Sequence, residues 1–125
     1  MLVLTRFIAR HELHPLRHSL GIDDILKGAR KVNKGLGIEV RQPMKLGHIR
    51  FFKVRIGKRN AARMIVFMQS EKQGIVPVLI RMKNDKIFGT NMAMNNPDVK
   101  SQINKNLLRI FEDIQQKAYE EFSLE

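Results

Sequence analysis

The chain has 125 residues, no cysteine, and 23 Lys and Arg against 12 Asp and Glu, which gives a formal net charge of +11. This length predicts one domain, residues 1–125, whose hydrophobic core is large enough to be stable without disulfides or a structural metal. The lack of cysteine excludes disulfides and thiolate metal sites. No apolar run reaches the ~20 residues of a membrane span, and the N-terminus does not resemble a signal peptide. We therefore expect a cytoplasmic protein without a membrane partner.

Residues 1–40 are expected to be mainly helical. The segment LVLTRF could form a short strand, and Pro15 interrupts the helix that follows it. A second helix is predicted from residue 21, with Asp23 or Asp24 as its N-cap. The apolar face of this helix consists of Ile25, Leu26, Ala29 and Val32. The glycines Gly35 and Gly37 are expected to end it.

Residues 47–90 are predicted to form a β-sheet, because the apolar period changes to two. Phe52, Val54 and Ile56 share one face of the first strand, and Phe51, Lys53 and Arg55 share the other. A turn at 57–60 leads to a second strand, Ala62–Met68, and polar residues 70–74 connect this strand to a third, Ile75–Met82. Pro77 is unusual there, since proline favours strand edges.

Residues 96–121 are predicted to form a long C-terminal helix. Asn96 is expected to be its N-cap and Pro97 its first helical residue. One apolar stripe follows, made of Val99, Ile103, Leu107, Ile110 and Ile114. The predicted fold class is α+β: N-terminal helices, an antiparallel meander of at least three strands, and a long C-terminal helix.

The positive charge is concentrated in the middle of the chain. Residues 41–86 hold 12 Lys and Arg against 2 Asp and Glu, whereas residues 87–125 hold 4 against 6. A concentrated basic block is typical of a protein that binds a polyanion, with nucleic acid as the leading partner class.

Several of these cations are predicted to share one face of the sheet. Lys53 and Arg55 would lie about 7 Å apart on one strand, and antiparallel pairing would bring Arg63 near them. Arg81, Lys83 and Lys86 lie at or beyond the end of the third strand. We expect one face of the sheet to carry the core under the helices and the other to bind phosphate.

These residue types suit RNA cleavage without a metal. Arginine binds phosphate oxygens bidentately, and a lysine among other cations has a lowered pKa and can act as a base. His48 is a further acid/base candidate. His11, His14 and His18 could share a helical face, but Pro15 lies among them, and we predict neither a metal site nor a cofactor. The methionines Met64, Met68, Met82, Met92 and Met94 are interpreted as core filling or a partner surface.

Three segments resemble the RelE/ParE superfamily of bacterial toxin–antitoxin toxins. GIDDILKGARKVNKGLG is similar to the helix before the family's sheet, RFFKVRIGKRNAARMIVFM to its paired strands, and VLIRMKNDKIFG to its last strand. The resemblance covers residues 21–91. It implies a toxin that cuts mRNA in the ribosome without a metal and that a cognate antitoxin protein neutralises.

The resemblance also implies site residues. The catalytic residues would be Lys53, Arg55, Arg63 and Lys83, with Arg63 stabilising the transition state and Lys53 or Lys83 taking the proton. Binding of RNA is expected at Arg50, Lys58, Arg59, Arg81, Lys86 and Phe88.

This chain departs from the family pattern in three places. Phe88 stands where a base-stacking tyrosine is often found, the turn GKRNAAR lacks a second glycine, and the tail beyond residue 92 is long. Two alternatives stay open: a ParE-like gyrase inhibitor, and a basic nucleic-acid-binding protein without catalysis.

Overall fold

The computed structural model describes residues 1–41, 47–69, 74–88 and 92–125. Its two longer helices are α2 (Ile22–Asn33) and α3 (Pro97–Gln115). Its strands are β1 (Leu2–Thr5), β2 (Ile38–Val40), β3 (Ile49–Ile56), β4 (Ala62–Gln69), β5 (Ile75–Met82) and β6 (Tyr119–Phe122). Short helical turns complete it: α1 (Arg6–Ile8), the π-turn η1 (Ala9–Leu13), and the 3₁₀ turns η2 (His14–Leu16) and η3 (Lys58–Asn60).

One mixed sheet contains all the strands, in the order β2-β3-β4-β5-β1-β6. The antiparallel meander β3-β4-β5 and the α+β class are confirmed. Of the polar connection predicted at 70–74, residues 70–73 lie outside the described residues. β1 pairs in parallel with β5 and antiparallel with β6. Segments from opposite ends of the sequence therefore form the part of the sheet beyond β5.

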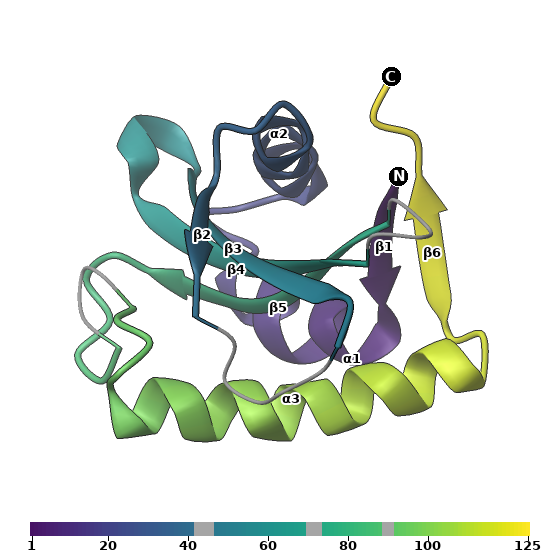
Figure 1. Ribbon diagram of the computed structural model, residues 1–125. Coiled ribbons are helices and arrows are strands. Elements are labelled where there is room, and N and C mark those ends of the chain that lie inside the picture. Colours follow the sequence, from purple (N-terminus) through teal and green to yellow (C-terminus); the bar gives the residue numbers. More distant parts are fainter. Residues whose placement is uncertain (42–46, 70–73, 89–91) are drawn as a thin grey trace.

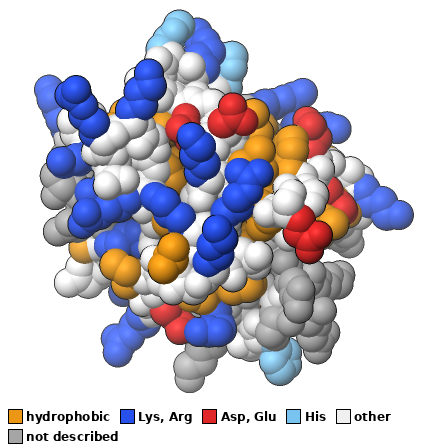
Figure 2. Space-filling view, turned by 90° about the horizontal axis from the view of Figure 1, so that it is seen from above, with side chains coloured by type: hydrophobic (Ala, Val, Ile, Leu, Met, Phe, Trp, Pro, Cys, Tyr) orange, Lys and Arg blue, Asp and Glu red, His pale blue; other side chains and the backbone are white. Residues whose placement is uncertain are grey.

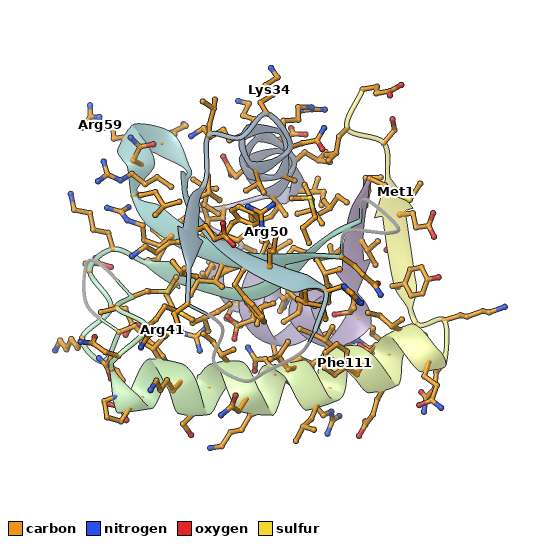
Figure 3. All side chains as sticks on the ribbon, in the orientation of Figure 1. Met1, Lys34, Arg41, Arg50, Arg59 and Phe111 are labelled. Atoms are coloured by element: carbon orange, nitrogen blue, oxygen red, sulfur yellow. The ribbon has the colours of Figure 1, made fainter. Side chains whose placement is uncertain are left out.

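The sheet lies between α2 and α3, which cover its opposite faces (Figure 1). Val54 and Ile56 pack under α2, whereas Phe67 contacts Phe111 of α3, with ring centroids 6.0 Å apart. Figure 3 shows Phe111 between α3 and the sheet. The expectation of one apolar face and one open cationic face is therefore wrong. Phe51, on the same face of β3 as Lys53 and Arg55, is fully buried. The cations occupy only the hairpin end of that face.

The helix starts follow local hydrogen bonding. Asn96 caps α3 as predicted, since its Oδ1 accepts from the Asp98 N–H at 2.8 Å. The cap of α2 is Gly21, not Asp23 or Asp24, because the helix begins at Ile22. Asp24 instead reaches back and accepts from the Gly21 N–H at 2.9 Å. This bond satisfies one donor at the helix start.

The C-terminal helix is shorter than predicted. It ends at Gln115, Lys117 adopts a left-handed φ of 58°, and residues 119–122 form β6. The sheet correspondingly extends beyond residues 47–90, because β1, β2 and β6 belong to it. β6 is a strand because it supplies backbone partners to the outer side of β1.

Pro77 is accommodated by a bulge in β5. The register with β4 shifts between Ile65, opposite Leu79, and Val66, opposite Pro77, which leaves Val78 as the extra residue. The carbonyl of Val78 accepts from Nδ2 of Asn106, a fully buried residue of α3, at 2.7 Å. The bulge thereby fixes α3 to the sheet through a buried hydrogen bond.

Candidate nucleic-acid interface

A row of three arginines crosses the meander near its hairpin end. Arg55 of β3 lies opposite Arg63 of β4, which lies opposite Arg81 of β5. Directly opposed residues have Cβ atoms about 5 Å apart, and like charges at this distance destabilise a sheet. An anion beside the row offsets this repulsion, and Glu12 supplies one for Arg81.

A pocket of about 360 Å³ opens beside Arg55 and Arg63. The residues that line it, defined here as the cationic pocket, are Lys31, Leu36, Ile38, Lys53, Val54, Arg55, Asn60 and Arg63. The structure thus brings together three of the predicted catalytic residues: Lys53, Arg55 and Arg63. In the view of Figure 2, from the α2 side, Lys and Arg predominate towards the β3–β4 hairpin.

The pocket forms because β2 is short. The register ends with Ile38 opposite Lys53, so within the described residues no strand lies beside the outer edge of β3 beyond Lys53. Lys31 reaches this edge from α2, and its Nζ donates to the Arg55 carbonyl at 3.0 Å. Lys31 could not be predicted as a residue of this pocket, because its place on a helix does not indicate that its side chain reaches the end of a distant strand.

Arg63 is the most enclosed cation of the pocket, at 8% exposed. Its Nη1 donates to the carbonyls of Asn60 at 2.7 Å and Ala62 at 3.2 Å, which orients the side chain beneath the hairpin turn. Burial, then the charge of Arg55, lowers the pKa of Arg63. The guanidinium stays charged, because the ordinary pKa of arginine is so high. A fixed guanidinium suits transition-state charge.

Lys53 has the environment of a base. Burial lowers the pKa of Lys53 below the ordinary 10.5, and the positive charges of Arg63 and Arg55 lower it further. All three causes oppose the ammonium form. A lysine of this kind loses its proton more readily near neutral pH than an exposed lysine does.

The lowered pKa of Lys53 predicts a pH dependence of stability. Between this pKa and 10.5 the unfolded chain binds the proton more strongly than the folded protein does, so the free energy of unfolding should rise with pH. Urea denaturation at intervals from about pH 8 to pH 10.5 should show a steeper rise for wild type than for Lys53→Met. Equal slopes for the two proteins would contradict the burial of a charged Lys53.

Arg81 is held away from the pocket by an ion pair. Its Nη1 contacts Oε1 of Glu12, the only acidic side chain among the buried polar residues of the described chain. The guanidinium also lies 4.6 Å from the ring centroid of Phe88. Phe88 is only 8% exposed, so its ring is covered rather than open for base stacking. The structure therefore does not support Phe88 as a stacking platform.

Arg50 and His48 lie apart from the pocket. Arg50 is on the opposite face of β3, where it donates to Glu39 at 2.7 Å and lies 5.2 Å from the centre of the Phe52 ring. His48 precedes the other end of β3, about 23 Å along the strand from Arg55. Neither residue can act in the same site as Arg63.

A second basic depression lies on the other side of the hairpin turn. It has a volume of about 380 Å³ and is lined by Arg59, Ala61, Met82, Lys83 and Asn84. Lys83 is therefore grouped with Arg59 and not with the cationic pocket. Lys58 is exposed on η3, and Lys86 is exposed after β5.

The N-terminal histidines have other neighbours. His11 stacks on Phe7, with ring centroids 4.5 Å apart. Across residues 1–41, 47–69, 74–88 and 92–125, no three His, Cys, Asp or Glu side chains gather as metal ligands would. Met64 and Met92 are fully buried, which confirms the core interpretation for these two methionines. None of the helices among those residues is long and apolar enough to span a membrane.

Comparisons of the chain with protein-family models, with curated proteins and with solved structures find no match.

Proposed function

We propose that the protein is a cytoplasmic RelE-like toxin, a ribosome-dependent mRNA endoribonuclease that works without a metal and is neutralised by an antitoxin protein. The observation that carries this proposal is the cationic pocket, in which Lys53, Arg55 and Arg63 converge. Among the described residues that line this pocket, none is acidic. A phosphodiester is therefore its expected ligand, and an acidic antitoxin segment would compete for the same charges.

The pocket divides the chemistry between two residue types. Lys53, with its lowered pKa, would accept the proton of the attacking 2′-hydroxyl. The 2′-oxygen would bond to phosphorus as the bond from phosphorus to the 5′-oxygen breaks, and the departing 5′-oxygen would take a proton from water. Arg63, oriented by the Asn60 carbonyl, would stabilise the charge of the pentavalent phosphate, and exposed Arg55 would hold its oxygens. Lys83 lies in the other depression, so the proton-accepting role is assigned to Lys53.

Binding of RNA without cleavage is the second candidate. It is favoured by the burial of Phe88 and by the lack of a histidine among the lining residues that the structure describes. Under this reading the chain would bind RNA with a strong dependence on salt and leave it intact.

Induced expression in a bacterial host separates these functions. Wild type should arrest growth and produce new 5′ ends within translated reading frames of cellular mRNA. Arg55→Ala, which changes an exposed side chain of the pocket, should weaken both effects strongly. Lys105→Ala removes an exposed lysine of α3 and should behave like wild type.

Other outcomes of the expression experiment would each support a different function. Arrest without new mRNA ends, equal in wild type and Arg55→Ala, would support the gyrase inhibitor and contradict the nuclease. If the wild-type protein is soluble and folded but neither arrests growth nor cuts mRNA, RNA binding without cleavage remains as its function.

A further inference from the structure

At the tip of the β3–β4 hairpin, an arginine adopts a backbone conformation that arginine disfavours. Arg59 has φ 55° and ψ 27°, and Asn60 also has a φ of 55°. Glycine and asparagine enter this left-handed region readily, whereas an arginine does so at a cost. Turns with two such residues usually contain Asn-Gly or Asp-Gly. Arginine at position 59 is therefore not explained by the turn.

The surrounding structure holds the tip in this strained shape from both sides. On one side, Nη1 of Arg63 donates to the Asn60 carbonyl at 2.7 Å. On the other side, the Lys83 N–H donates to the Ala61 carbonyl at 2.7 Å. Strain that neighbouring bonds maintain in this way is found at binding and catalytic sites.

The strained tip also lies between the two basic depressions. Asn60 lines the cationic pocket, whereas Arg59 lines the second depression, together with Lys83. Two strand spacings, about 10 Å, separate β3 from β5 beneath the tip. Figure 3 shows the Arg59 side chain directed away from the body of the protein.

We infer that Arg59 joins the two depressions into one phosphate track, which runs from the cationic pocket over the hairpin tip to Lys83. This inference rests on the proposed function and extends it. The ligand would be a polynucleotide strand held at several consecutive phosphates, rather than at one scissile phosphate. Arg59 is kept at a strained position because its charge bridges the gap between the two depressions.

The presence of cations on both sides of the tip favours a nucleic-acid strand over an acidic peptide. Phosphates recur at regular intervals along a strand and would meet cations on both sides of the tip. Counterion release makes such binding depend on salt, with a logarithmic slope of about −0.7 for each phosphate neutralised on a single strand. An acidic peptide carries its charge on flexible side chains and has no fixed phosphate spacing.

Arg59→Asn tests the inference, because it removes the charge and relieves the backbone at the same time. The variant should melt a few degrees higher than wild type. It should also bind a single-stranded oligouridylate about fivefold more weakly near 0.1 M salt, with a salt slope smaller by about 0.7. Lys117→Asn is the matched control, since Lys117 is also an exposed cation with a left-handed φ, 58°, and it lies just after the C-terminal end of α3, outside both depressions. It should gain similar thermal stability and keep wild-type affinity.

Three results would overturn the inference. Unchanged affinity in Arg59→Asn, with weaker binding in Arg55→Ala, would confine the ligand to the cationic pocket and leave the proposed function standing. Equal losses in Arg59→Asn and Lys117→Asn would show a general effect of net charge. Polyglutamate that binds as tightly as the RNA and with the same dependence on Arg59 would replace the strand with an acidic peptide. Wild type that binds no RNA would instead contradict the proposed function itself.

Discussion

Lys53→Met is expected to reduce mRNA cleavage on programmed ribosomes by about 10²–10⁴-fold, the usual contribution of a general base. The side chain lines the cationic pocket, and burial together with Arg63 and Arg55 lowers its pKa. Methionine has a similar length and fills the half-buried space, but it cannot accept a proton. The measurement is the single-turnover rate of cleavage at saturating toxin, which separates chemistry from binding.

Lys53→Arg sharpens this test. Arginine keeps the positive charge but holds its proton at any accessible pH, so RNA binding should persist while cleavage is lost. In wild type the rate should rise with pH up to the lowered pKa of Lys53 and then level off. Cleavage by Lys53→Arg at near the wild-type rate would refute the assignment of Lys53 as the base and limit its role to charge.

Glu12→Ala is expected to lower the free energy of unfolding by about 3 kcal/mol, a loss typical when one partner of a buried ion pair is removed. Glu12 is 3% exposed and accepts from the Ile80 N–H at 2.7 Å as well as from Arg81. Alanine would leave both donors without this acceptor. Urea denaturation at pH 7 measures the change.

Glu12→Gln is the informative companion to this variant. Its side-chain oxygen can still accept from Ile80, but it cannot neutralise Arg81, so the loss should be smaller than for Glu12→Ala. Adding Arg81→Met to Glu12→Gln should recover part of the remaining loss, since no buried charge would then lack a counterion. A loss under 1 kcal/mol for Glu12→Ala would mean that water replaces the carboxylate easily.

The meander and the convergence of Lys53, Arg55 and Arg63 could be predicted from the sequence. Alternation places Lys53 and Arg55 on one face of β3, and pairing across a short turn must bring Arg63 opposite one of them. The start of α3 could also be predicted, because Asn96 and Pro97 form a strong local signal. These features are determined by residues that lie close together in the sequence, so the local sequence pattern is enough to predict them.

The features that could not be predicted depend on distant partners. β6 reads YEEF and is a strand only because it supplies hydrogen bonds to β1. The end of α3 was misplaced because Lys117, rather than a glycine, occupies the left-handed position after it. The pairing of Glu12 with Arg81 joins residues 69 positions apart, and nothing in either local sequence indicates it.

The placement of β1 between β5 and β6 also bears on how the molecule folds. Pairing Leu2 with both Ile75 and Phe122 closes long loops, whereas the β3–β4 hairpin closes a short one. Because loop closure costs entropy that grows with length, contacts within the meander should form before β1 is inserted. The strands that carry the arginine row, β3, β4 and β5, would then belong to the folding nucleus. The pair β1–β6 would be a separate cooperative unit that opens at a lower free energy.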